Sequence, residues 1–393
     1  MKIKKINFLS LTLFAFSIII LSGCQAIKTF TRKPGQYNGA NSFSWQVPAF
    51  DASKKNIFIV ANTKLTELFD MIAPFYLFKA TERANVFIVA EDKSPILIKD
   101  KLYVLPQITF NEIDSLKLRA DVIVIPFIGV IDTNQNPVIV NWIKGHYTET
   151  TKILSICDGA ATAAATGLYD GQPLTCHASD YALVSSHFSK PHWVQQVSVT
   201  RSGNLYSTAG VSNAVDGSLM VINDLFGRQA MLDLMSNIHY RYPEIKLDHQ
   251  SIVVDTKDKL IIIRKIFFRK NRNVAVLLQD GVNELELASV LDTYGRTFPA
   301  RFEALILHGT TVKTRYGLTL VSTQNNNLDD LSELHIVNQQ TLAKEDASLL
   351  KNVNVVRYDN SFIEYPIDVC IKRIATQYGC KFAGVAKVML DYN

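Results

Sequence analysis

Cys157 is the residue best placed to act as a nucleophile in this chain of 393 residues. It ends the apolar run KILSI at 152–156 and is followed by the small residues of DGAATAAA. A strand that turns sharply into a helix exposes one side chain at the carboxyl edge of a sheet, and small neighbours let the helix pack closely. The helix N-terminus, including the Asp158 N–H, is expected to favour the thiolate. A buried structural cysteine is the alternative interpretation.

The surrounding sequence predicts the sheet that this turn requires. Apolar runs at 56–61, 85–90, 121–127 and 152–156 have the length and composition of buried strands, and the segments between them have helical periodicity. Such alternation indicates an α/β fold with a mainly parallel sheet that is covered on both faces.

Two segments are repeated. NIFIVANTKLTEL at 56 is echoed by NVAVLLQDGVNELEL at 273, which pairs Asp70 with Glu286. AVDGSLMVINDLFG at 214 is echoed by PIDVCIKRIATQYG at 366, which pairs Asp216 with Asp368. The second copy is shorter between these anchors, and the missing part corresponds to the turn at Cys157 and the residues after it. Chance similarity between two α/β halves is the alternative.

The first residues have the pattern of a secretory signal. Three lysines precede an apolar run that ends in Leu21-Ser22-Gly23-Cys24, which resembles the bacterial lipobox. The resemblance implies a signal peptide at 1–23, lipidation of Cys24 and a polar tether at 24–53. Gln25 follows the cysteine, so we expect a lipid-anchored envelope protein on the outer membrane, facing the periplasm. An uncleaved anchor helix is the alternative.

Charge and cysteine content exclude several function classes. Without the three lysines of the signal, 38 basic side chains face 36 acidic ones, which does not favour a nucleic-acid partner. Four cysteines besides Cys24 allow two disulfides in an oxidising compartment, and Cys157 with Cys176 is one pair to consider. Their spacing predicts no metal site, and no cofactor is expected.

Two longer segments carry a family resemblance. SICDGAATAAATGLYDGQPLTCH at 155–177 and GNLYSTAGVSNAVDGSLMVINDLFG at 203–227 are similar to the ThiJ/PfpI family of the class I glutamine amidotransferase-like superfamily, in its isonitrile hydratase and AraC-associated sensor branch. The resemblance implies tandem flavodoxin-like three-layer α/β/α sandwiches. We expect an intact domain at 54–245, a linker at 246–272 and a degenerate domain without the turn at 273–393. Family members commonly dimerise, so the two domains are expected to form an internal pseudo-dimer.

The resemblance also implies a set of site residues. Asp70 matches the carboxylate that approaches the cysteine and would share a proton with it, although Glu67 could take the same role. His177 matches a histidine that orients substrate or moves a proton. The N–H of Asp158 and the backbone near Gly129 would form an oxyanion site.

The chain also departs from the family pattern. The segment Pro126-Phe127-Ile128-Gly129 stands where two glycines are usual, Ala178 replaces a tryptophan, and Asp158 replaces the histidine of peptidase-like members. These residues predict a cysteine-dependent hydrolase or hydratase that acts on a small molecule. The alternative is a non-catalytic ligand-binding, redox-sensing or scaffold module of the cell envelope.

Overall fold

The computed structural model describes residues 35–39, 43, 45, 48–99, 101–132, 135–269, 271–323, 328, 330–337, 344–350, 352–358 and 363–393. The predicted signal peptide at 1–23, the lipidation site Cys24 and most of the predicted tether lie outside the described residues. Within the described part of the chain, no helix combines the length and the apolar character needed to span a bilayer.

The first half is built on a seven-stranded sheet in the order β10-β11-β7-β6-β1-β2-β5. Its strands are β1 (Lys55–Val60), β2 (Ala84–Ala90), β5 (Ile108–Thr109), β6 (Val122–Ile125), β7 (Lys152–Ile156), β10 (Val199–Ser202) and β11 (Leu205–Thr208). All neighbouring strands are parallel except β10, which runs antiparallel to β11. The prediction of an α/β fold with a mainly parallel sheet is confirmed.

Successive side chains of β1 enter different cores on the two faces of this sheet. Ile57 and Ile59 pack in one cluster, and Phe58 and Val60 pack in the other. The first face is covered by α2 (Leu68–Ala80), α7 (Ala214–Phe226) and α8 (Arg228–Asn237). The second is covered by α3 (Phe110–Ser115), α4 (Pro137–His146) and α5 (Gly159–Ala165). Because both faces are buried, the strands read as continuous apolar runs.

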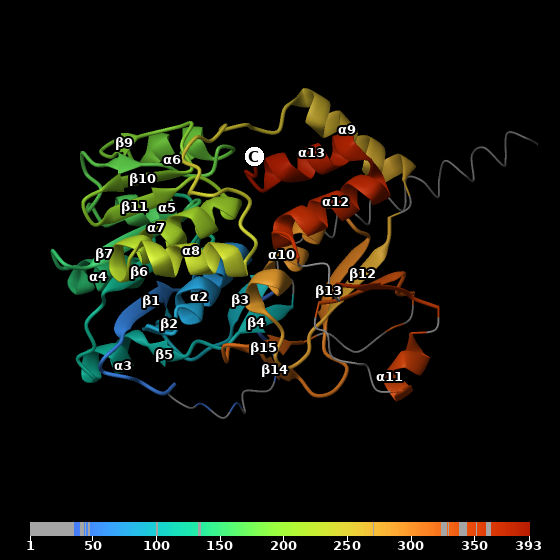
Figure 1. The fold of residues 1–393 in the computed structure, drawn as a ribbon, viewed down its shortest axis with the longest axis horizontal. Coiled ribbons are helices and arrows are strands. Elements are labelled where there is room, and N and C mark those ends of the chain that lie inside the picture. The colour runs from blue at the N-terminus through green and yellow to red at the C-terminus, as the bar shows by residue number, and fades with distance from the viewer. Residues whose placement is uncertain are drawn as a thin grey trace, which may run out of the picture.

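The second half has a four-stranded parallel sheet in the order β13-β12-β16-β17. Its strands are β12 (Asn273–Leu277), β13 (Arg301–Leu305), β16 (Glu333–Ile336) and β17 (Asn354–Arg357). This order repeats that of β2-β1-β6-β7. Helices α10 (Glu284–Gly295), α12 (Pro366–Tyr378) and α13 (Cys380–Met389) cover one face, and α11 (Lys344–Leu349) lies after β16. Figure 1 shows the first half, blue to yellow, beside the second, orange to red.

The helix ends support the register of the repeat. Glu67 is the N-cap of α2 and Asn283 is the N-cap of α10, so Asp70 and Glu286 occupy the same position in the first turn. The last two helices of each half have the same lengths in the two halves. Helices of 13 and 10 residues are separated by one glycine, Gly227 with φ of 90° or Gly379 with φ of 94°. A left-handed φ of this kind is freely adopted only by glycine.

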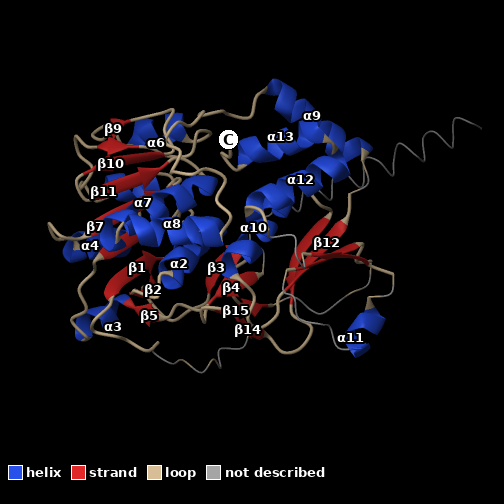
Figure 2. Ribbon diagram, viewed as in Figure 1, coloured by secondary structure: helices blue, strands red, loops and turns tan. Residues whose placement is uncertain are grey.

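The halves are joined by a shared sheet and by packed helices. A hairpin of β3 (Ile96–Lys99) and β4 (Leu102–Val104) meets a hairpin of β14 (Thr311–Lys313) and β15 (Thr319–Ser322), in the order β14-β15-β4-β3. β4 and β15 pair antiparallel, and α2 packs against α10. Figure 2 shows these short strands between the two larger sheets. One continuous apolar cluster therefore runs from β1 to α13.

Residues 246–272, predicted as a linker, contain the helix α9 (Thr256–Phe268). α9 packs against α13, and the buried Lys265 donates a hydrogen bond to the carbonyl of Phe298 at 2.7 Å. The segment therefore contacts both halves: the carbonyl of Leu247 accepts from the N–H of Ser198 at 2.9 Å, whereas α9 packs on the second half.

Candidate functional site

Cys157 lies on the sharp turn between β7 and α5. Its φ is +55°, a left-handed value that is uncommon for a residue other than glycine, and its side chain is 3% exposed. Gly159 explains why small residues follow, because a Cβ there would lie 2.2 Å from the carbonyl oxygen of Ile125. The buried alanines of α5 pack in the same core as Ile125. The sequence thus places one sulfur at the carboxyl edge of the sheet.

Asp70 is fully buried in the first turn of α2. Its Oδ2 accepts a hydrogen bond from the N–H of Phe127 at 3.1 Å, and its own N–H donates to Oε2 of the N-cap Glu67 at 2.7 Å. Oδ1 is buried and has no hydrogen-bond partner among the described residues. One carboxyl oxygen is therefore fixed by the backbone, while the other is left for a proton or a ligand.

The backbone after β6 donates its hydrogen bond to Asp70, so this N–H is not free to bind an oxyanion. The N–H of Phe127 is engaged by Asp70, and the carbonyl of Phe127 accepts from the N–H of Glu67 at 2.8 Å. Gly129, with φ of 84°, lies against the side chain of Leu65 and is not among the residues that line the cavity at Cys157. Of the two predicted backbone donors, only the N–H of Asp158 faces the sulfur.

A cavity of about 520 Å³ opens beside Cys157 and is lined by both halves of the chain. The first half contributes Glu67, Lys99, Phe127, Cys157, Asp158 and His177, and the second half contributes Asp292, Arg296, Phe298, Phe302 and Met389. Sequence reasoning missed the whole second wall. A local signal was present, because Asp292 and Arg296 are four residues apart at the end of α10, and this spacing places both on one face of a helix.

The surroundings of the thiol and of the carboxyl favour the protonated form of each group. Burial, followed by the charges of Asp70 and Asp158, raises the pKa of Cys157 well above its ordinary value and outweighs the hydrogen bond from the Asp158 N–H. Burial and the neighbouring Glu67 raise the pKa of Asp70 well above its ordinary value. The expectation of a thiolate is wrong here, because burial and acidic neighbours act more strongly than the N-terminus of a seven-residue helix.

Two further acids border the cavity. Burial, followed by the charge of Asp292, raises the pKa of Glu67 to about 7. Burial, followed by the charge of Asp180, raises the pKa of Asp158 to about 8, although its carboxyl accepts a hydrogen bond from the backbone of His177. Neither group is fully ionised at neutral pH, so the pocket contains several exchangeable protons.

His177 lies in the same cavity as Cys157. Its Nδ1 accepts a hydrogen bond from the N–H of Ser179 at 3.2 Å, and the ring bonds to the carbonyl of Met389. Burial lowers the pKa of His177. A neutral ring that accepts at Nδ1 and donates to a carbonyl is consistent with a fixed orientation at neutral pH.

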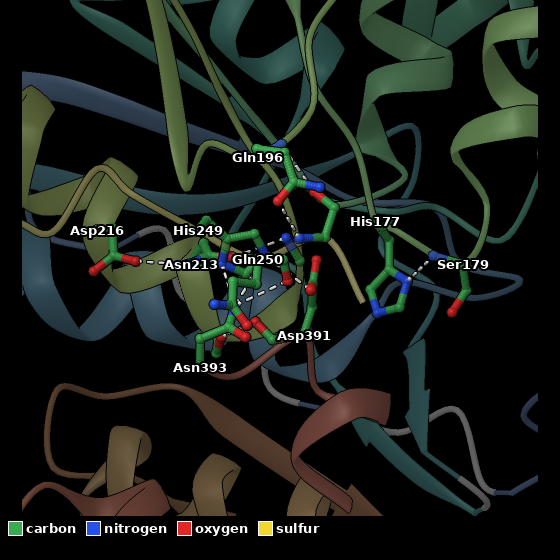
Figure 3. A network of polar contacts seen from close by, with 12 residues as sticks. His177, Ser179, Gln196, Asn213, Asp216, His249, Gln250, Asp391 and Asn393 are labelled. Carbon is green, nitrogen blue, oxygen red and sulfur yellow. Dashed lines mark hydrogen bonds and ion pairs between the residues drawn. The ribbon is translucent and has the colours of Figure 1, made fainter. Parts of the chain in front are cut away.

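The last residues of the chain lie against this histidine. Figure 3 shows His177 and Ser179 beside a second polar cluster built on His249, Asp391 and Asn393. His249 and Asp391 are both buried and lie 2.8 Å apart. Ser212 donates from its side chain to the carbonyl of Asp391 at 2.8 Å, so this segment of the second half closes the pocket from the His177 side.

Cys157, Cys176, Cys370 and Cys380 are all free thiols, and the first three are buried. Burial raises the pKa of Cys176. The described residues hold no group of three or more side chains arranged to bind a metal ion.

The fold and this site define an α/β domain with a cysteine on a strand-to-helix turn beside a buried acid. Residues 54–223 match the model of the DJ-1/PfpI family. This part of the chain is therefore similar to a DJ-1/PfpI domain.

The chain is also similar to individual proteins. An isonitrile hydratase of Pseudomonas putida is 24% identical over 159 residues, which cover 40% of this chain and 67% of that protein. A ThiJ/PfpI family protein of Pseudomonas syringae is 20% identical, with a TM-score of 0.42 over 48% of this chain and 76% of that structure. DJ-1beta of Drosophila melanogaster is 18% identical, with a TM-score of 0.42 over 48% of this chain and 100% of that structure.

Proposed function

We propose that this protein is a cysteine-dependent hydratase that adds water to the isonitrile group of a small molecule. The observation that carries the proposal is a Cys157 thiol that lines the cavity, with the buried Asp70 carboxyl close enough to raise the pKa of that thiol. The similarity to an isonitrile hydratase supports the substrate group.

The chemistry of an isonitrile suits this pair. Its terminal carbon carries a lone pair, so it must be protonated before a nucleophile can attack it. A carboxylic acid that remains neutral at pH 7 can donate that proton, and Oδ1 of Asp70 is the oxygen that no other group engages among the described residues. An ionised aspartate beside an ionised cysteine would lack the proton that this first step needs.

The complete reaction balances with water alone. Asp70 protonates the carbon, the Cys157 sulfur bonds to it, and the thiol proton returns to Asp70, which leaves a thioimidate. Water then adds to the same carbon. The carbon–sulfur bond breaks, the sulfur regains a proton, and an N-substituted formamide leaves. The N–H of Asp158 faces the sulfur and would steady charge that develops there.

Product formation tests this proposal directly. The full chain in detergent is incubated with cyclohexyl isocyanide, and the formamide is followed by NMR. We expect Cys157→Ser to abolish turnover and Asp70→Asn to lower kcat by at least about a hundredfold. Cys380→Ser, which removes the exposed thiol, is the matched control and should retain full turnover. Formamide production by Cys157→Ser at the original rate would contradict the proposal.

A second candidate function is a ligand-binding or redox-sensing module of the cell envelope. It is favoured by the hydrogen bond from the Phe127 N–H to Asp70. Because this N–H is engaged, it cannot help to stabilise an oxyanion, and the Asp158 N–H is left as the donor at the sulfur. Under this alternative the cavity binds its ligand and releases it unchanged. The isonitrile assay separates the two, because a binding module retains ligand without producing a formamide.

We also propose that the chain is a lipoprotein anchored through Cys24, with both halves acting as one internal pseudo-dimer. The motif LSGC and the polar segment after it support the anchor. The β4–β15 pairing and the α2–α10 contact support the pseudo-dimer. Incorporation of labelled palmitate that is lost in Cys24→Ser, together with recovery in the outer-membrane fraction, is the expected outcome. Unlabelled protein in a soluble fraction would contradict the anchor.

A further inference from the structure

The helix α9 exposes large apolar side chains along the outer edge of the second half (Figure 1). Leu260 is 60% exposed, Ile263 is 48% exposed and Phe268 is 69% exposed. The opposite face of α9 is the buried one, because Lys265 and Ile266 are enclosed where the helix packs against α13. Closely spaced exposed residues of this size form a patch of the kind that marks an interaction site.

Exposed basic side chains border this apolar patch. Lys257 lies three residues before Leu260 and Arg264 lies four residues after it, so all three share one face of the helix. Lys259 lies four residues before Ile263 and is exposed on the other side of the patch. None of these three cations forms an ion pair with a described residue.

The acids of this region lie at one end of α9. Asp255 is the N-cap and Asp258 completes the capping box, in which each carboxyl accepts a hydrogen bond from the backbone N–H of the other residue. The neighbouring α13 contains no acidic residue, and its Lys381 is exposed. Without the buried Lys265, α13 and α9 with its two caps carry six basic groups against two acidic ones. The positive surplus therefore remains with both acids counted as ionised.

A basic helix with an exposed apolar patch fits the surface of an anionic lipid bilayer. The basic groups bind phosphate headgroups, while the apolar side chains enter the boundary between headgroups and acyl chains. The long stems of lysine and arginine let their charges stay at the level of the headgroups. A second copy of the chain, bound through the same face, would instead bring like charges against one another.

We propose that α9 is a peripheral membrane-contact element, which docks the second half on a bilayer that contains anionic phospholipid and inserts Leu260, Ile263 and Phe268 at the acyl-chain boundary. This contact goes beyond the proposed hydratase and does not depend on the Cys24 anchor. A lipid anchor on a tether leaves the orientation of the protein free, whereas α9 determines which side of the protein faces the membrane.

A fluorophore at position 260 tests the contact. Leu260→Cys is made in the full chain together with Cys24→Ser and Cys380→Ser, so that a nitrobenzoxadiazole label is confined to position 260, the other three cysteines being buried. The protein is reconstituted into phosphatidylcholine vesicles with or without phosphatidylglycerol, and a doxyl-labelled lipid serves as the quencher. We expect quenching to be at least about twofold stronger in the anionic vesicles. Equal quenching in the two lipids would overturn the proposal.

Two controls separate α9 from the rest of the surface. Leu116→Cys, which places the label at an exposed leucine after α3 in the first half, should be quenched equally in the two lipids. Replacement of Lys257, Lys259 and Arg264 by glutamine, or a high salt concentration, should remove the difference at position 260.

Two further outcomes would also overturn the proposal. The first is an equal lipid dependence at positions 116 and 260, because the contact would then not be directed by α9. The second is a blue-shifted emission at position 260 that grows with protein concentration in detergent, because a second copy of the chain would then cover the patch. The readout needs no turnover, so failure of this proposal is distinguishable from failure of the hydratase.

Discussion

Asp292, in the second half of the chain, lies 3.4 Å from the ammonium of Lys99, in the first half. The contact crosses the boundary between two regions that could each have been read as a separate domain. Because Arg296 pairs with the same carboxylate, one residue of α10 neutralises charge from both halves. The stability of the first half and the shape of its pocket thus depend on the second.

Removal of Asp292 should be costly. In Asp292→Ala, Lys99 and the largely buried Arg296 lose their shared counter-ion, and we expect a loss of about 3 kcal/mol in the free energy of unfolding. Denaturant unfolding measures the loss. Glu244→Ala is the matched control, because the Arg228–Glu244 pair is exposed on both sides and should contribute less than about 1 kcal/mol. Similar losses in both variants would show that the buried contact has no special role.

Cys157 should react slowly with thiol reagents at neutral pH. Its pKa is raised by burial and by the charges of Asp70 and Asp158, so the thiolate is scarce. Asp70→Asn removes a carboxyl whose ionised form opposes the thiolate, and we expect faster labelling of Cys157 at pH 9 together with loss of turnover. Mass spectrometry of the labelled peptides measures both thiols, with the exposed Cys380 as the internal reference. Slower labelling in Asp70→Asn would mean that the aspartate activates the sulfur.

The contribution of Asp158 to the stability of the protein should fall as the pH rises above about 4. Asp158 has a folded-state pKa of about 8 against an ordinary value of 3.8, so between these values the folded state holds a proton that the unfolded state has lost. The stabilisation from protonated Asp158 is complete below the unfolded-state pKa of 3.8 and is lost as the pH rises through the folded-state pKa of about 8. The raised pKa values of Glu67 and Asp70 act in the same direction.

Asp158→Asn should remove this dependence in part. Relative to the unsubstituted protein, we expect the variant to gain about 4 kcal/mol in unfolding free energy between pH 5 and pH 8.5. Denaturant titrations at the two pH values measure the gain. Asp170 forms an exposed ion pair with Lys190, so Asp170→Asn should have the same unfolding free energy as the unsubstituted protein at both pH values. A gain that is the same at pH 5 and pH 8.5 would exclude titration of Asp158 as its cause.

Gly159 should tolerate no side chain. In Gly159→Ala, the new Cβ would overlap the backbone of Ile125 and Pro126, which cannot move without distorting β6. We expect a loss of about 3 kcal/mol or more in unfolding free energy. Gly145→Ala, in the exposed part of α4 with no atom near its added Cβ, should instead stabilise the protein by about 0.5 kcal/mol. Thermal unfolding of the two variants measures the contrast.

Sequence reasoning predicted the four central strands of the first sheet, β1, β2, β6 and β7, because continuous apolar runs and helical periodicity are local signals. It also placed Cys157 on its turn, since a strand end followed by small residues is visible in the sequence. The electrostatics of the site could not be predicted in the same way. The state of a thiol depends on how completely it is buried and on which carboxyls lie around it, and Glu67, Asp70 and Asp158 come from separate segments.

The second wall of the cavity was missed for a related reason. The repeat indicated that a second half exists, but not which of its helices faces Cys157. That depends on the antiparallel pairing of β4 with β15, which sets how the two hairpins and then α2 and α10 meet. This pairing brings Lys99 to Asp292 and Arg296, which already lie together at the end of α10.

The equal helix pairs on either side of Gly227 and Gly379 have an evolutionary consequence. In a homodimer, every substitution is made in both subunits at once, so an interface residue must suit two identical active sites. Here the two copies lie on one polypeptide and mutate independently. The end of α10 could acquire Asp292 and Arg296 for the Cys157 pocket, while the same turn of α2 was free to keep Tyr76 and Ala80. The second half thus supplies one wall of the cavity at Cys157 from positions where the first half has Tyr76 and Ala80.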